Sequence, residues 1–339
     1  MIASRIFSSV SSPISVRAAA IFCFACAISC SRVGLAGAAG FLSFFFQNIV
    51  IPFSLILVKV GLMNYRHIYH AGNFADVMKH LSVVLILDRL RGKETPFFAL
   101  DAHGGCGFYD LSSEQAQKTG EWQAGIGRFA DDTSMPDDFR LYYDLVKRDL
   151  PVKAYPGSPT IIARMLRDQD RLVTSELHPE DVQTLRLNLA MHKGVRVQHQ
   201  DAYECIRAQV PPKEKRGLVL IDPPFEKTDE FETLCRQMEE WKRRFAHGVY
   251  VIWYPIKAHL PVGGLKEAAR ALNLPRTWVC ETLLHPREKE GVLNGCGVIV
   301  FNAPYMMPER MAALLPYLSE QMKLFDAPHS WLVPDSASA

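Results

Sequence analysis

The sequence predicts an α/β fold built around a mostly parallel, Rossmann-like sheet. Short apolar runs alternate with stretches of helical periodicity, the order typical of strand–helix–strand units. The run 218–221, Leu-Val-Leu-Ile, contains no polar residue, as expected of a strand buried on both faces. A second run, 96–100, leads into an acid and a glycine-rich turn, residues 101–107, where a Rossmann-like sheet usually holds a cofactor.

The first helix is predicted over residues 74–91, where apolar residues recur at helical spacing and Asn73 is the N-cap. No helix follows the glycine turn directly. Residues 108–155 are largely polar, and a clear helix start appears only at Ser158-Pro159. We therefore predict an inserted helical subdomain at 108–155, because a compact unit would start its helix at once. Ser158 is then expected to return to the glycine turn, beside the cofactor.

The remaining elements follow in order along the chain. Strands are predicted at 171–177, 195–200, 218–221, 249–254, 277–284 and 297–302, and helices at 158–169, 179–191, 203–210, 229–245, 262–272 and 308–324. A charged loop containing Asn294-Gly295 joins the last two strands, which predicts an antiparallel hairpin at the sheet edge. Residues 335–339 are expected to be a disordered tail.

Residues 1–62 differ in kind from the rest, since they are mostly apolar and contain no Asp or Glu. Three interpretations compete: a targeting or membrane segment, a transit peptide, or a start assigned upstream of a true first residue at Met63. Without the four basic residues of this segment, the formal net charge changes from +2 to −2. The rest of the chain is therefore no uniformly basic nucleic-acid binder, and any such contact must come from local clusters.

The eight cysteines are scattered. The one Cys-x-x-Cys pair, Cys23 and Cys26, lies within an apolar run and has no second pair. This pattern predicts reduced thiols, as in a cytoplasmic protein, with neither a disulfide framework nor a metal site.

The segment Asp222-Pro223-Pro224-Phe225 follows the strand at 218–221 directly, and its two prolines fix the backbone at the carboxyl edge of the sheet. An acid, two prolines and an aromatic residue at a strand end are typical of methyltransferases that act on exocyclic amines. An adenine amine is a poor nucleophile, because its lone pair is delocalised into the ring. Two acceptors, the Asp222 carboxylate and the Pro223 carbonyl, could draw it toward a tetrahedral nitrogen. Phe225 gives the flat base a stacking surface, worth about 1–3 kcal/mol.

Two further acids lie at predicted strand ends. Counting from Ser158, Glu176 falls where dinucleotide-binding folds carry the acid that binds the ribose hydroxyls. Asp201 follows the third strand, where a carboxylate and the next backbone N–H, that of Ala202, commonly contact a cofactor adenine. Glu176 could instead be an N-cap or a surface residue.

Seven motifs in this order resemble the RlmJ family of bacterial 23S ribosomal RNA adenine-N6 methyltransferases: MNYRHIYHAGNFADVMKH, LDAHGGCGFYDL, AYPGSP, SELHP, QDAY, LVLIDPPF and VIWYPI. The resemblance covers Met63 to about Pro334. It implies a class I S-adenosylmethionine-dependent methyltransferase domain at 63–334, with a seven-stranded sheet whose last strand is antiparallel and a small helical insertion. It also implies a cytoplasmic protein, expected to be a monomer, that binds 23S rRNA and not DNA. The substrate would be one adenine in free or partly assembled RNA, nucleotide 2030 in the family.

The resemblance also assigns roles to residues. Asp222 would be the catalytic residue, and Tyr65, together with Pro223 and Phe225, would contact the substrate. The S-adenosylmethionine site would be lined by His80, His103, Ser158, Glu176, Asp201, Ala202 and Asp222. Family chains begin near Met63, which favours the upstream-start interpretation of residues 1–62.

Two alternatives remain open. The same chemistry could act on DNA adenine or on a protein glutamine. If residues 1–62 are real, the chain could instead be a membrane-tethered, non-catalytic nucleotide-binding module.

Overall fold

A computed structural model describes residues 66–335 of the chain. The predicted N-terminal segment, Tyr65 and the last four residues of the predicted tail lie outside the described residues. Within residues 66–335, no helix combines the length and the apolar composition needed to cross a bilayer.

The main sheet has eight strands in the order β10-β8-β9-β7-β6-β1-β4-β5. They are β1 (Phe98–Asp101), β4 (Arg171–Glu176), β5 (Val195–His199), β6 (Gly217–Ile221), β7 (Val249–Ile256), β8 (Thr277–Leu283), β9 (Gly295–Phe301) and β10 (His329–Val333). The five strands from β5 to β7 run parallel, whereas β9 is antiparallel to both of its neighbours. All seven predicted strands are present, and β9 is the expected antiparallel last strand of a class I methyltransferase fold.

Two details of this sheet differ from the prediction. The hairpin of β8 and β9 does not simply extend the edge, because β9 inserts between β7 and β8. An eighth strand, β10, then pairs with β8 and forms the edge itself. Every residue of β9 is buried, as an inner strand requires, whereas only Leu332 of β10 is buried, so its sequence lacks an apolar pattern.

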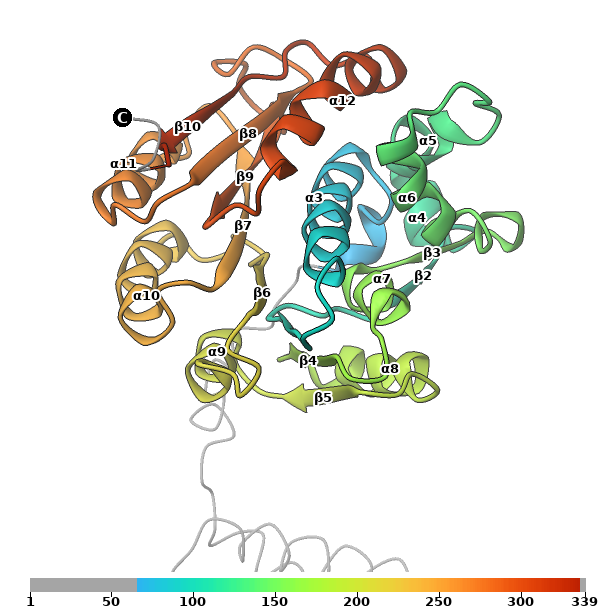
Figure 1. The fold of residues 1–339 in the computed structure, drawn as a ribbon. Coiled ribbons are helices and arrows are strands. Elements are labelled where there is room, and N and C mark those ends of the chain that lie inside the picture. Colours follow the sequence, from blue (N-terminus) through green and yellow to red (C-terminus); the bar gives the residue numbers. More distant parts are fainter. Residues whose placement is uncertain (1–65, 336–339) are drawn as a thin grey trace, which may run out of the picture. The chain divides into compact units, whose positions relative to one another are not determined.

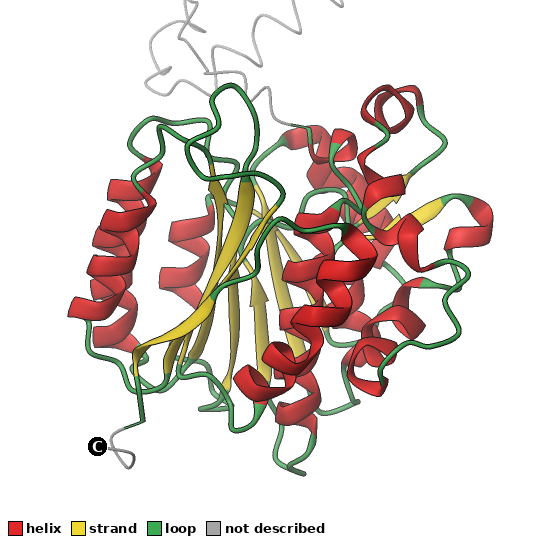
Figure 2. Ribbon diagram, turned by 90° about the horizontal axis from the view of Figure 1, so that it is seen from above, coloured by secondary structure: helices red, strands yellow, loops and turns green. Residues whose placement is uncertain are grey.

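Helices cover both faces of the sheet (Figure 2). Alternate strand residues divide between two cores: Leu218 and Leu220 face one, and Val219 and Ile221 face the other. The first core is covered by α3 (Phe74–Arg91), α7 (Ser158–Met165), α8 (Pro179–Leu189) and α12 (Met307–Met322). The second is covered by α9 (Ala202–Gln209), α10 (Glu230–Arg244) and α11 (Val262–Ala271).

Residues 108–156 form a separate group of short elements beside α3 (Figure 1). They are β2 (Phe108–Asp110), α4 (Glu114–Thr119), α5 (Glu121–Ala124), η4 (Ile126–Phe129), α6 (Asp137–Val146), η5 (Leu150–Val152) and β3 (Ala154–Pro156). Because β2 pairs with β3, the group starts and ends at one place. The Gly157 N–H donates to the Gly107 carbonyl at 2.9 Å, so α7 begins at the glycine turn.

Candidate active site

The Asp222-Pro223-Pro224-Phe225 corner lies at the carboxyl end of β6, in the middle of the sheet. β1 pairs with β6 in parallel, with Asp101 opposite Leu220, so the glycine turn and this corner leave the sheet side by side. Phe225 has a φ of 51°, a left-handed conformation that is uncommon for an aromatic residue. Its ring packs 5.0 Å from the ring of Phe231 and 5.9 Å from that of Trp253, which fixes an aromatic surface beside the carboxylate.

Lys79, in the middle of α3, makes a short contact to Asp222. Its Nζ lies 2.5 Å from Asp222 Oδ2 and 2.8 Å from Asp76 Oδ1, and its side chain is 5% exposed. Burial alone would lower the pKa of Lys79, but the two carboxylates outweigh burial and raise it. The two carboxylates therefore favour the charged ammonium, which holds one oxygen of Asp222 in place.

His103, in the glycine turn, contacts the backbone of the same corner. The Asp222 N–H donates to His103 Nδ1 at 3.2 Å, which leaves the ring proton on Nε2. Burial lowers the pKa of His103 to about 4, although Asp222 and Asp201 oppose that shift. At neutral pH the ring is thus an uncharged donor through its Nε2–H.

Asp101 ends β1 and is fully buried. One carboxylate oxygen accepts the His103 N–H at 3.3 Å, and the other, Oδ2, has no hydrogen-bond partner within residues 66–335. Burial raises the pKa of Asp101 to about 7, which the neighbouring Ser158 and His103 offset only partly. Such an unpartnered buried oxygen is suited to a donor or a cation that the chain itself does not supply.

Glu176, at the end of β4, accepts hydrogen bonds from the glycine turn and from the loop that follows β4. Its Oε2 accepts the Gly105 N–H at 2.9 Å, and its Oε1 accepts the His178 N–H at 2.7 Å. Burial raises its pKa. The carboxylate therefore holds the glycine turn against the loop that follows β4, at the position predicted for ribose binding.

Asp201 caps the helix that follows β5. Its Oδ1 accepts the N–H groups of Tyr203 and Glu204, at 2.9 and 3.2 Å. A cap is thus one role of this carboxylate, although its charge also acts on His103. Ala202 is buried in the first turn of the same helix.

His80, the neighbour of Lys79 in α3, contacts the inserted residues 108–156. Its ring is 1% exposed, and its Nδ1 lies 2.8 Å from the Tyr155 hydroxyl, which in turn lies 2.9 Å from the Tyr142 hydroxyl. Burial lowers the pKa of His80 to about 3, so the ring is neutral. Its side chain joins α3 to residues 108–156, while its neighbour Lys79 reaches the site.

The structure thus brings Lys79 onto Asp222 and places His103 against the backbone of Asp222. Asp101 and Glu176 bond to the glycine turn, where α7 begins with Ser158. Lys79 and Asp101 were not among the predicted site residues. A signal existed for Lys79, because Asp76 and Lys79 stand three apart on one helix, a spacing at which opposite charges meet.

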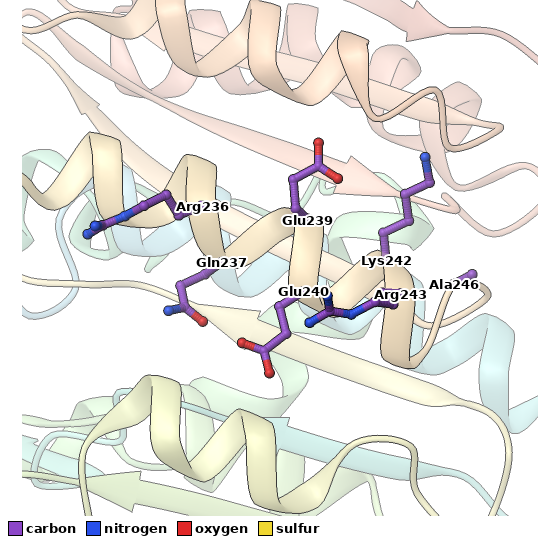
Figure 3. Close-up of a pocket in the computed structure, with 7 residues that line it drawn as sticks. All are labelled: Arg236, Gln237, Glu239, Glu240, Lys242, Arg243 and Ala246. Carbon is purple, nitrogen blue, oxygen red and sulfur yellow. The ribbon is translucent and has the colours of Figure 1, made fainter.

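One hollow of the described surface lies away from this site. A hollow of about 830 Å³ lies over α10 and is lined mainly by charged side chains, including Arg236, Glu239, Glu240, Lys242 and Arg243 (Figure 3). It contains none of the predicted site residues. Within residues 66–335, no group of three or more His, Cys, Asp or Glu side chains could hold a metal ion.

Comparisons with known proteins point to one family. Residues 94–333 match the family model described as "Ribosomal RNA large subunit methyltransferase D, RlmJ". The "Ribosomal RNA large subunit methyltransferase J" of Haemophilus influenzae is 38% identical over 276 residues, 80% of this chain and 98% of the relative. The Escherichia coli protein of the same name is 35% identical over 280 residues, 81% and 100% of the two chains. A crystal structure of a Legionella pneumophila protein matches with a TM-score of 0.71 at 32% identity, covering 77% of this chain and 97% of that one.

Proposed function

Since the chain belongs to the RlmJ family of large-subunit ribosomal RNA methyltransferases, we propose that it methylates the exocyclic N6 amine of one adenine in 23S rRNA. Nucleotide 2030 is the target that the family suggests, in free or partly assembled RNA. The observation that carries the proposal is the Asp222 carboxylate. It lies at a proline corner beside the glycine turn, with one oxygen held by a buried lysine and a neutral histidine bound to its backbone.

Asp222 and Pro223 would activate the amine. Lys79 engages Asp222 Oδ2, so Oδ1 is the oxygen that can accept one N–H of the amine, and the Pro223 carbonyl accepts the other. The two bonds orient the nitrogen lone pair away from the corner. Phe225, fixed by its contacts with Phe231 and Trp253, supplies the stacking surface. Once methylated, the nitrogen carries a positive charge and loses a proton, either to Asp222 or to water.

The residues around the glycine turn fit S-adenosylmethionine. The unpartnered Oδ2 of Asp101 suits the ammonium group of its methionine part, and the Nε2–H of His103 is a donor in the same region. Glu176 would hold the ribose hydroxyls, and Asp201 with Ala202 would contact the adenine. When bound, S-adenosylmethionine supplies an electrophilic methyl group.

The decisive trial incubates protein starting at Met63 with radiolabelled S-adenosylmethionine and protein-free 23S RNA. Label in the RNA, mapped to an N6-methyladenine, is expected. Parallel reactions with double-stranded DNA and with a protein carrying accessible glutamines separate the two alternative substrates. Absence of label in RNA would remove the proposal.

Glu176→Gln should weaken binding of S-adenosylmethionine by about tenfold to a hundredfold, or about 1.4–2.7 kcal/mol. The amide would put an N–H₂ group against the N–H of Gly105 or His178 and loosen the glycine turn. Titration calorimetry measures the affinity, and turnover at saturating cofactor should stay within about threefold of the unmodified protein. Unchanged affinity would show that Glu176 does not support the cofactor.

Tyr65→Ala should leave cofactor affinity unchanged and impair turnover, because Tyr65 is expected to contact the RNA substrate. Calorimetry with S-adenosylmethionine and steady-state methylation of RNA measure the two effects separately. Tyr69→Ala, four residues further on, is a suitable control. Weakened cofactor binding by the Tyr65 variant would place this residue in the cofactor site instead.

A further inference from the structure

Asp76 is a buried carboxylate in the first turn of α3, and sequence reasoning assigned it no role. We propose that Asp76 is a positioning residue for methyl transfer: it holds Lys79 so that Asp222 keeps a full negative charge and one free oxygen for the target amine. This inference rests on the proposed function and adds a residue to it.

The contacts of Asp76 come from three directions. Its side chain is 2% exposed, and its Oδ1 accepts a hydrogen bond from Lys79 Nζ at 2.8 Å. Its Oδ2 accepts the Gly72 N–H at 2.9 Å and lies 3.0 Å from His67 Nε2. The Asp76 backbone N–H donates to the Asn73 side chain, which caps the helix. Both carboxylate oxygens are therefore fixed, and the carboxylate cannot turn away from Lys79.

The charges explain why a second carboxylate is useful. Burial would raise the pKa of Asp76, but chiefly the neighbouring His67 and Lys79 hold it well below its usual range, so Asp76 is charged. The ring of His80 is neutral, as described above. Asp76, Lys79 and Asp222 together therefore carry one negative charge in excess, and His67 lies beyond them, at the oxygen of Asp76 that does not contact Lys79. If Lys79 had only Asp222 as a partner, that pair would be neutral and Asp222 would be a weaker acceptor.

The reaction needs that excess charge. The amine nitrogen becomes positive as its bond to the methyl carbon forms, and it must then release a proton. A fixed negative charge at the acceptor stabilises this change without any rearrangement at the moment of reaction. The bond from Lys79 to Asp76 also keeps the ammonium near Oδ2 of Asp222 and away from the oxygen that the amine needs.

The test uses the full chain with Asp76→Asn. Single-turnover methylation of 23S RNA should fall about a hundredfold, the scale of losing one preorganised electrostatic contact, while affinity for S-adenosylhomocysteine stays within about threefold. Lys79→Met and the double variant Asp76→Asn/Lys79→Met complete a cycle. If Asp76 acts through Lys79, the double variant is no slower than Lys79→Met alone. If the double variant instead lost activity by the product of the two single losses, Asp76 would have a merely structural role and the proposal would be overturned.

Asp170→Asn is the matched control. Asp170 is equally buried, pairs with Arg167 at 2.8 Å and accepts the Phe97 N–H at 3.0 Å, but it lies before β4, at the amino edge of the sheet. The Asp170→Asn variant should be less stable than the unmodified protein, but its folded fraction should methylate RNA at the unmodified rate. The same assay separates the proposed function from the role of Asp76. If the unmodified protein fails to label RNA, the proposed function is wrong. If Asp76→Asn labels RNA as fast as the unmodified protein, only the role of Asp76 is wrong.

A crystal structure of the unmodified protein with S-adenosylhomocysteine and adenosine keeps the proposal testable if Asp76→Asn does not fold. Lys79 Nζ should stay within hydrogen-bond distance of both carboxylates while Asp222 Oδ1 meets the adenosine amine. A lysine that has left Asp76 for the ligand would overturn the proposal.

Discussion

Methyl transfer to RNA should be abolished by Asp222→Ala, while affinity for S-adenosylmethionine should change by less than about tenfold, or about 1.4 kcal/mol. The variant loses the carboxylate that accepts the amine N–H but keeps the peptide N–H that fixes His103. Label incorporation into 23S RNA measures the first effect, and titration calorimetry measures the second.

Asp222→Asn refines this experiment. The amide keeps an acceptor of the same shape but cannot take a proton at neutral pH. Measurable residual turnover would show that Asp222 acts as a hydrogen-bond acceptor and that water takes the proton. A loss of cofactor affinity of several kcal/mol in either variant would instead mean that Asp222 mainly binds the cofactor.

Lys79→Met should lower the free energy of unfolding by about 3–5 kcal/mol, because it removes one partner from a buried ionic group. The buried Asp76 and the partly buried Asp222 would then be two carboxylates on either side of an apolar side chain. Urea unfolding followed by circular dichroism measures the loss. Turnover of the folded variant should also fall strongly, because Asp222 is no longer held.

The loss should shrink as pH falls. In the unmodified protein the lowered pKa of Asp76 contributes stability that is fully present above its unfolded value, about 4, so this contribution is constant between pH 5 and 8. In the variant, protonation removes the unpaired charge, so the two proteins should differ less at pH 5 than at pH 8. Lys266→Met is the control, since its partner Glu281 keeps Arg287 at 2.5 Å. An equal loss in both variants would contradict a special role of the Lys79 bridge.

The position of the proline corner was predictable from sequence because it depends on local rules. An uninterrupted apolar run marks a strand buried on both faces, and two prolines must end it, so Asp222 had to lie at a strand end. The position of the glycine turn was predictable for the same reason, because it directly follows the apolar run of β1. The set of motifs predicted the RlmJ family, and the comparisons confirm it.

The side of α3 that faces the site could not be predicted. Every residue from 74 to 87 is buried, so the helix has no polar face from which its orientation could be derived. The resemblance named His80, whose ring bonds to Tyr155, and no sequence pattern indicated that its neighbour Lys79 meets Asp222. The position of β9 within the sheet could not be predicted either. A hairpin has the same sequence pattern at the edge of a sheet and inside it, and the order of the strands depends on which of them pack together.

The sequence by itself determined the class of fold, the family and the acid at the end of β6, because each depends on residues close together in the chain. Only the tertiary structure decided which charges meet at that acid. Asp76 and Lys79 come from a helix far from Asp222 in the chain, and the direction of their side chains is set by how that helix packs on the sheet.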